Sequence, residues 1–385
     1  MLRARFAPAV AHRVLYLIDS LGMGGAERGL TLTVRHLDRA KVEPEVAFLW
    51  APDTLAAEIE ATGVTVHRLD ARPGPAALKA VPAVTRLLQE GRFDAIHTQV
   101  LWASVVGRAA GRRAGVKVVS HIANVETGGF RDRELSPSIA RKARIVAKLD
   151  ELTGRRWVDR FVAISEAVRA DPIRGRSWDR SKIDVVLRGQ ELDRLRAEAE
   201  REPSRPLDVR GDPSILTVGR LSEQKGQRFL IEAMPAVLEA FPRARLLLCG
   251  DGHLRADLER RAARLGEGVA FLGIRDDVPA LTRRASLFVF PSLWEGQGNA
   301  LLEAMAVGVP IVATDIPSTR ETLREGEGVL VPPGDAASLA TAMIGLLGDP
   351  DRASRLATAA AARADDYDID ATTRALESVY DRLLA

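Results

Sequence analysis

Short apolar runs recur along the chain, and stretches in which apolar residues follow helical spacing separate them. In the first half these runs cover 14–18, 46–50, 64–69, 95–97, 116–120, 161–164 and 183–187. In the second half they cover 214–218, 245–249, 269–272, 287–290 and 311–313. A continuous apolar run of this length is typical of a strand buried on both faces. Strands that alternate with helices predict an α/β protein with doubly wound parallel sheets.

The pattern breaks once, in a segment rich in proline and polar residues that covers 202–206 and 211–213. Such composition is typical of a linker between domains. The alternation restarts at residue 214, so we expect two consecutive α/β domains, 1–202 and 212–365, with a cleft between them. An amphipathic segment, 371–385, closes the chain.

Composition favours an ordinary folded protein. The 385 residues are 46% hydrophobic and 28% charged, which is close to the globular average and argues against disorder. The net charge of +3 is too small to indicate nucleic-acid binding. No run approaches the roughly 18 apolar residues of a membrane span, and the first residues do not form a signal peptide. We therefore expect a cytoplasmic protein, at most peripheral at the inner face of the plasma membrane.

The segment 291–306 carries the most chemistry. Glycines at positions 296 and 298 lie between an apolar run and a helix-forming stretch, where backbone N–H groups and the helix dipole favour a phosphate. Glu295 precedes this anion site, and Glu303 lies up to about 12 Å further along if the interval is helical. Carboxylates beside a phosphate are suited to accept hydrogen bonds from hydroxyls. A phosphate with a hydroxyl-rich group at each end describes a nucleotide-sugar. An ordinary strand–turn–helix with two surface glutamates remains the alternative.

Glu295, seven intervening residues and Glu303, followed by Ala-Met-Ala and by Gly-Val-Pro-Ile-Val-Ala-Thr at 308–314, resemble the C-terminal signature of family 4 glycosyltransferases. These are retaining enzymes of the GT-B fold. The resemblance spans nearly the whole chain and is more specific in the second half. It implies two Rossmann-like domains facing a cleft, with the C-terminal helix crossing back to the N-terminal domain. The first domain would bind the acceptor, and the second would bind the donor.

A second motif, Gly219-Arg220 followed by Lys225-Gly226, also resembles this family. An arginine at a strand end and a lysine five residues later can converge on one diphosphate, the first as a planar fork and the second as a point charge. The resemblance implies donor-binding roles for the following residues: Gly24, Gly25, Arg220, Lys225, Ile274, Gly296, Gln297, Gly298, Asn299 and Glu303. Among them, Glu303 would hold the ribose, and Ile274 would lie beside the base.

The first half offers two further candidates. The glycines before Glu27 do not complete G-x-G-x-x-G, which weakens a dehydrogenase interpretation. Gly24-Gly25 instead resembles the family's loop facing the donor phosphates, although a tight turn explains the spacing equally well. His121 follows a predicted strand, where a doubly wound sheet places ligand-facing residues. The resemblance implies that His121 and Glu295 are the catalytic residues and contact the transferred sugar. The chain departs from the family at Arg188, where relatives often carry asparagine.

We expect no metal and no cofactor. Two D-x-D strings at 366–370 lie near the C-terminus with no nucleotide-binding sheet before them, so they favour a helix cap and a turn. No histidine or cysteine spacing indicates a metal site. The nucleoside-diphosphate-sugar is then a donor substrate. In the family the acceptor attacks on the face that the phosphate leaves, and the phosphate takes the acceptor proton, so we assign no protein nucleophile.

The partners depend on residues 131–160, where nine cations face five acids. This stretch is either a solvated face or a basic surface for an anionic membrane or a phosphorylated acceptor. The sequence therefore predicts a retaining glycosyltransferase of the hexosyltransferase type, acting on a glycan, glycolipid or small-molecule acceptor in cell-envelope polysaccharide, glycolipid or glycoside biosynthesis. A nucleotide-sugar epimerase, a phosphorylase of the same fold and a non-catalytic sugar-binding scaffold stay open as alternatives.

Overall fold

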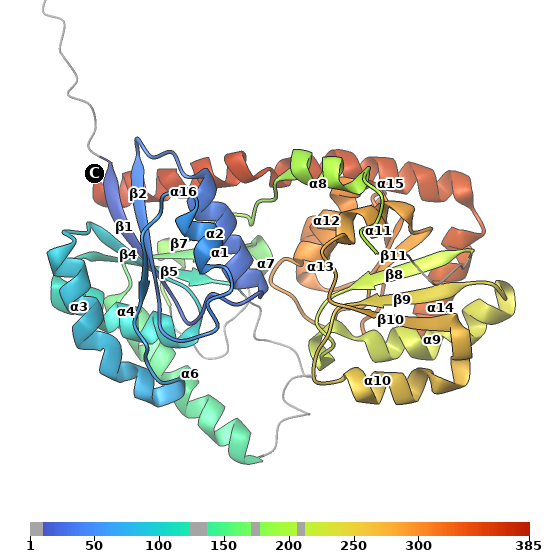
Figure 1. Ribbon diagram of the computed structural model, residues 1–385, viewed down its shortest axis with the longest axis horizontal. Coiled ribbons are helices and arrows are strands. Elements are labelled where there is room, and N and C mark those ends of the chain that lie inside the picture. The colour runs from blue at the N-terminus through green and yellow to red at the C-terminus, as the bar shows by residue number, and fades with distance from the viewer. Residues whose placement is uncertain (1–10, 124–136, 171–177, 206–211) are drawn as a thin grey trace, which may run out of the picture. The chain divides into compact units, whose positions relative to one another are not determined.

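The computed structural model describes residues 11–123, 137–170, 178–205 and 212–385. Burial of side chains is described for the same residues except 137–145. The described chain divides into two compact units (Figure 1). The first unit contains the residues up to Gly189 together with Ile369–Ala385, and the second contains Gln190–Asp368. Each unit is an α/β structure around one parallel sheet, which confirms the predicted fold class.

The sheet of the first unit has seven strands in the order β3-β2-β1-β4-β5-β6-β7, all parallel. The strands are β1 (His12–Ile18), β2 (Val42–Phe48), β3 (Val66–Arg68), β4 (Ala95–Thr98), β5 (Lys117–Ile122), β6 (Arg160–Ala163) and β7 (Ile183–Val185). In β1 the five residues from Val14 to Ile18 are fully buried, which is the reason for their unbroken apolar run.

Helices cover both faces of this sheet (Figure 1). One face carries α1 (Gly25–His36), α2 (Ala56–Glu60) and α16 (Ile369–Leu384). The other carries α3 (Val81–Glu90), α4 (Leu101–Ala114) and α6 (Pro137–Trp157). Short pieces, α7 (Glu166–Ala170) and the 3₁₀ turns η1 (Gly74–Ala80) and η2 (Arg180–Lys182), complete the unit. The last helix of the chain thus returns to the first unit, where it packs beside α1.

The second sheet has six parallel strands in the order β10-β9-β8-β11-β12-β13. They are β8 (Ser214–Val218), β9 (Arg245–Cys249), β10 (Val269–Gly273), β11 (Leu287–Phe290), β12 (Ile311–Thr314) and β13 (Val329–Val331). The helices on one face are α9 (Gln227–Ala240), α10 (Arg255–Ala262) and α14 (Ala336–Leu347). The remaining helices are α8 (Leu192–Ala199), α11 (Val278–Arg284), α12 (Asn299–Val307), α13 (Pro317–Thr322) and α15 (Pro350–Ala364). The 3₁₀ turns are η3 (Glu223–Lys225), η4 (Ala263–Gly268) and η5 (Asp365–Tyr367).

The units divide at a different place from the one that the sequence predicts. Helix α8 lies within the predicted first domain, 1–202, yet it belongs to the second unit, where it packs on α11 and α12. Arg196 of α8 also pairs with Asp365 at 2.6 Å. The chain therefore changes unit at Gly189–Gln190, before the proline-rich segment, and changes back at Asp368–Ile369 instead of at 365. A linker-like composition does not reveal which side of it packs on which core.

Candidate active site

The second sheet reverses its strand order between β8 and β11, which are hydrogen-bonded neighbours. Ligands of doubly wound proteins bind at the carboxyl ends of the strands beside such a reversal. Arg220 follows β8 and Glu295 follows β11, so the two strongest motifs of the sequence meet this position from adjacent strands.

The loop after β11 leads directly into α12. Gly298 lies at the N-cap with φ 86°, and a Cβ there would lie 2.8 Å from Cζ of Phe290, so only glycine fits. Gly298 itself has no side chain with which to cap α12. The positive end of the helix dipole is thus directed at the loop, which favours a bound anion.

Glu295 is buried and held by three side chains. Lys225 Nζ lies 2.5 Å from Glu295 Oε1, and Ser292 Oγ donates to the same oxygen at 2.8 Å. Gln224 Nε2 donates to the other oxygen at 3.4 Å and to the Trp294 carbonyl at 2.9 Å. These contacts fix the position of the carboxylate. The structure therefore brings two predicted site residues, Lys225 and Glu295, into direct contact.

Arg220 precedes Lys225 in the same loop after β8 and is exposed. Its carbonyl accepts a hydrogen bond from Gln227 Nε2 at 2.9 Å, which fixes the backbone. Its guanidinium forms no hydrogen bond or ion pair with another described residue, which leaves its donors available to an anion. Gly226, at φ 63°, lets the loop approach the Pro291 carbonyl, which a Cβ would meet at 2.1 Å.

The other predicted donor-binding residues of this unit occupy the same loop and its surroundings. Gly296, Gln297 and Gly298 are buried, and Asn299 opens α12. Glu303 lies half-buried one turn further along α12, and Ile274 is 70% exposed directly after β10.

Burial raises the pKa of the Cys249 thiol, at the end of β9, to about 11, and the Glu303 carboxylate adds to this effect. This thiol is thus protonated at neutral pH, which argues against a nucleophilic cysteine.

In the first unit the strand order reverses between β1 and β4. Gly24 is the N-cap of α1 and Gly25 its first residue, so the predicted glycine loop lies at this reversal. A Cβ on Gly24 would lie 2.3 Å from Glu27 Oε2.

Sequence reasoning missed Asp19, which follows β1 and accepts the Ala103 N–H at 2.6 Å. Burial raises the pKa of Asp19 to about 6, and its place after a buried strand was the available signal.

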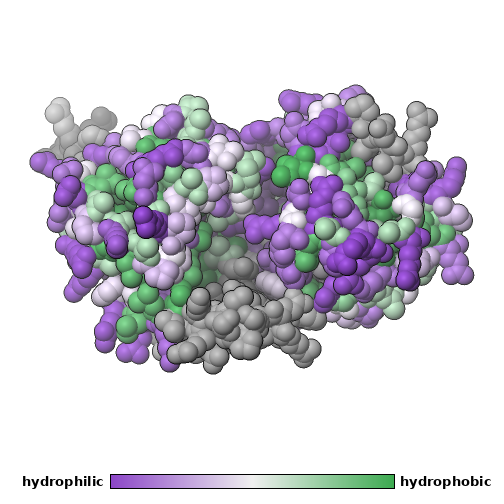
Figure 2. Space-filling view, turned by 60° about the horizontal axis from the view of Figure 1, so that its bottom comes forward, coloured by the Kyte–Doolittle hydropathy of each residue, from purple (hydrophilic) through white to green (hydrophobic). Residues whose placement is uncertain are grey.

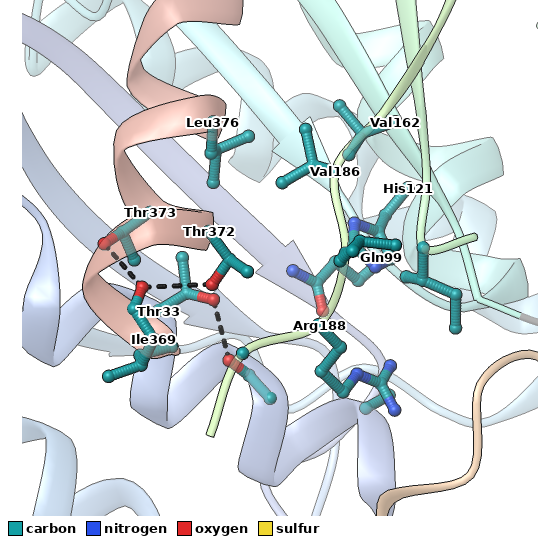
Figure 3. A pocket seen from close by; sticks show the side chains of 15 residues that line it. Thr33, Gln99, His121, Val162, Val186, Arg188, Ile369, Thr372, Thr373 and Leu376 are labelled. Atoms are coloured by element: carbon teal, nitrogen blue, oxygen red, sulfur yellow. Dashed lines mark hydrogen bonds between the residues drawn. The ribbon is translucent and has the colours of Figure 1, made fainter. Parts of the chain in front are cut away.

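His121 lies in β5, one residue before its end, and lines a pocket of about 40 Å³ (Figure 3). The side chains around it come from strand ends, from α1 and from α16, and include Gln99, Arg188, Thr33 and Thr372. Burial, together with His97 and Arg188, holds the pKa of His121 well below its usual value. The imidazole is therefore neutral and suited to hydrogen bonding with an uncharged hydroxyl.

Arg188, where the chain departs from the family pattern, lies beside α1 and at this pocket (Figure 3). A Cβ on Gly29 would lie 3.1 Å from Arg188 Nε, so the small residue makes room for the long side chain. The glycine that follows is required by α16, because a Cβ on Gly189 would lie 2.6 Å from the Ile369 Cα. The departure thus adds a cation to the wall of the His121 pocket.

Among the described residues no group of histidine, cysteine and acidic side chains has the arrangement of a metal site. The aspartates of the D-x-D strings take part in other interactions: Asp366 pairs with Arg363, and Asp370 Oδ1 lies 2.7 Å from His36 Nδ1. Asp368 caps the turn η5.

Two family profiles cover most of the chain. Residues 212–349 match the glycosyl transferases group 1, and residues 24–189 match the glycosyl transferase 4-like domain. The D-inositol 3-phosphate glycosyltransferase of Frankia alni is 31% identical over 385 residues, which cover 91% of this chain and 92% of that protein. The chain belongs to the family 4 glycosyltransferases.

Other similar proteins agree with this assignment. The Escherichia coli UDP-Gal:alpha-D-GlcNAc-diphosphoundecaprenol alpha-1,3-galactosyltransferase is 26% identical over 281 residues, or 71% of each chain. The Anabaena protein HepE, crystallised with UDP and glucose, superposes with a TM-score of 0.80 at 24% identity, covering 96% of this chain and all of that one. This glycosyltransferase therefore has the GT-B fold, as the resemblance implied.

Proposed function

We propose that this glycosyltransferase takes a sugar from a nucleoside diphosphate and transfers it to an acceptor hydroxyl with retention of configuration. The observation that carries the proposal is the Lys225–Glu295 pair at the reversal of the second sheet, with Arg220 exposed shortly after the end of β8. The names of similar proteins support it, because HepE was crystallised with UDP-glucose and the Escherichia coli relative is named for UDP-Gal.

In this proposal the second unit binds the donor. Arg220, Lys225 and the N-terminus of α12 hold the diphosphate, and the ribose hydroxyls donate to Glu303. The base lies beside Ile274. The loop from Gly296 to Asn299 holds the sugar together with Glu295, while the Gly24–Gly25 loop and His121 act from the first unit. Lys225 then has two anionic partners, the phosphate and Glu295, so the carboxylate stays paired when the donor arrives.

The reaction needs little proton chemistry from the protein. As the bond between sugar and phosphate breaks, the sugar gains positive charge, which the fixed carboxylate of Glu295 stabilises. The acceptor hydroxyl attacks from the side of the departing phosphate, and that phosphate takes its proton. Exclusion of water from the site favours transfer over hydrolysis.

UDP is expected to bind without a divalent cation, because two cationic side chains and a helix terminus meet the phosphate charge. Calorimetric titration of UDP in excess EDTA and in magnesium should give dissociation constants that agree within about threefold. Affinity that collapses in EDTA and returns with magnesium or manganese would contradict the metal-free site. GDP and ADP titrated in parallel identify the preferred base.

Incubation with UDP-sugars tests the function itself. Release of UDP that increases with an added acceptor supports transfer. Conversion of the donor to an epimer without UDP release indicates the epimerase, and glycoside cleavage that requires inorganic phosphate indicates the phosphorylase. A protein that binds UDP-sugars but never cleaves them would be the scaffold.

We further propose an acceptor that carries phosphate, such as a glycolipid or a phosphorylated small molecule. The names of the Escherichia coli and Frankia relatives include a diphosphate-linked lipid and an inositol phosphate, and that of a Mycobacterium leprae relative includes phosphatidyl-myo-inositol. In the described part of the predicted basic stretch, Lys148, Arg155 and Arg156 are exposed, as is Leu152. Residues 131–136 of the stretch lie outside the described residues.

Peripheral contact with a membrane would fit such an acceptor. None of the described helices combines the length and apolar character needed to cross a bilayer. Hydrophilic residues predominate on the face shown in Figure 2, with smaller apolar areas between them. Contact would then be electrostatic, with Leu152 at the surface to add apolar area.

Replacing Lys148, Arg155 and Arg156 together by glutamate is expected to abolish binding to vesicles of anionic lipid. Binding of the wild type should decrease steeply with salt, since screening shortens to about 8 Å at physiological ionic strength. Co-sedimentation measures both effects. Replacing the exposed cations Arg72, Lys79 and Arg86 of the same unit by glutamate gives the matched control. Equal binding to anionic and neutral vesicles would show that the stretch is only a solvated face.

A further inference from the structure

Three aromatic side chains of the first sheet share the face that α16 covers. Strand register pairs Tyr16 of β1 with His97 of β4, and His97 with Val119 of β5. Since side chains alternate along a strand, His121 lies on the same face as Val119. The rings of Tyr16 and His97 stack with centroids 5.1 Å apart, and those of His97 and His121 lie 5.6 Å apart. Helix α16 adds Tyr380 to this group.

Hydrogen bonds connect three of these residues and fix one proton. The Tyr380 hydroxyl donates to the Tyr16 oxygen at 2.7 Å and lies 2.6 Å from His97 Nδ1. A hydroxyl has a single proton, so toward His97 the Tyr380 oxygen must accept. His97 therefore carries its proton on Nδ1, and its Nε2 has a lone pair.

The two histidines leave one buried nitrogen each without a partner among the described residues, His97 Nε2 and His121 Nδ1. Burial lowers the pKa of His97 to about 3 and that of His121 well below its usual value, so both rings are neutral. If His121 carried its proton on Nε2, lone pairs on the two buried nitrogens would repel each other. If the proton lies on Nδ1, it can be donated to His97 Nε2 once the rings rotate toward each other, and both nitrogens are then satisfied.

We propose that Tyr16, Tyr380 and His97 are positioning residues that fix the proton of His121 on Nδ1. His121 Nε2 then presents a lone pair to the pocket and accepts a hydrogen bond from a ligand hydroxyl. The C-terminal helix thereby controls the hydrogen-bonding character of the site histidine. This inference rests on the proposed function in one respect, the contact between His121 and the transferred sugar.

The proton positions are measurable without activity. In protein labelled with ¹⁵N-histidine, the ring nitrogens of each tautomer have distinct shifts, and His97→Gln and His121→Gln assign two of the six histidines. We expect both His97 and His121 to be protonated on Nδ1. A wild-type His121 protonated on Nε2 would overturn the proposal, whatever the variants do.

The Tyr16→Phe variant reverses the chain of donors. Without its acceptor, the Tyr380 hydroxyl donates its proton to His97 Nδ1. His97 must then carry its own proton on Nε2. His121, whose Nδ1 now accepts from His97, must also carry its proton on Nε2. Tyr380→Phe instead removes the partner of His97 Nδ1. Tyr367→Phe is the control, because that tyrosine is also buried but belongs to the second unit. Unchanged tautomers in a folded Tyr16→Phe protein contradict the inference.

Kinetics test whether the proton position matters for transfer. Tyr16→Phe should lower kcat by about tenfold, the effect of losing one hydrogen bond in the transition state, while the Kd of UDP stays unchanged. Tautomers that change as expected with unaltered kcat would overturn the positioning role. Failure of the proposed function is a separate result, since a wild type that cleaves no nucleotide-sugar would still yield the predicted proton positions.

Discussion

Glu295→Gln is expected to lower kcat by about 10²–10³-fold while UDP still binds at least as tightly as to the wild type. A fixed charge directed at the developing charge of a transition state has an effect of this size. The sugar becomes positive only as its bond to phosphate breaks, so the carboxylate stabilises the transition state more than the ground state. The structure adds a second reason for undiminished UDP binding, because the substitution frees Lys225 from its 2.5 Å ion pair.

Glu303→Gln provides the contrasting variant. Its proposed partner, the ribose, is bound alike in ground and transition states, so the loss should appear mainly as weaker donor binding, by about 1.5–3 kcal/mol. Steady-state kinetics and calorimetric titration of UDP separate the two effects. Equal loss of UDP affinity in both variants, at unchanged kcat, would refute the division of roles between the two glutamates.

The sequence predicted the two sheets because strands buried on both faces leave unbroken apolar runs that a reader can find. It also identified the two short motifs that follow β8 and β11, and because parallel strands direct their carboxyl ends to one edge, Lys225 and Glu295 of these motifs lie in contact. Both signals are local. They need no knowledge of which helix packs on which sheet.

What sequence reasoning missed depends on packing between distant segments. Tyr380 and His97 are 283 positions apart, and only the return of α16 to the first unit brings them to 2.6 Å. Helix α8 likewise carries an apolar side, with Leu192 and Ala199 buried, that fits either domain until its partners are known. Asp19 follows an apolar run, which is a signal in the sequence, but the burial that raises its pKa appears only in the structure.

Arg108 shows the same limit for charge. Within the sequence it resembles the exposed Arg112 and Arg113 of the same helix, but it is 2% exposed. Its Nη1 pairs with Asp150 at 2.6 Å, its Nη2 donates to Ser120 Oγ at 2.8 Å, and its guanidinium lies 5.6 Å from the Trp178 ring centroid. One acid of the stretch 131–160 is thus a buried partner inside the first unit, so the stretch is not solvated throughout.

Asp150→Ala is therefore expected to destabilise the first unit by about 3–5 kcal/mol, because it leaves the buried Arg108 without its counter-charge. Urea unfolding followed by tryptophan fluorescence measures this well, since Trp294 is the only tryptophan of the second unit. Arg155→Ala, on the exposed side of the same helix, should change stability by less than about 0.5 kcal/mol. The double variant Arg108→Met/Asp150→Leu should regain most of the loss, because it buries no charge. If Asp150→Ala instead unfolds like Arg155→Ala, water reaches Arg108 and the ion pair does not stabilise the fold.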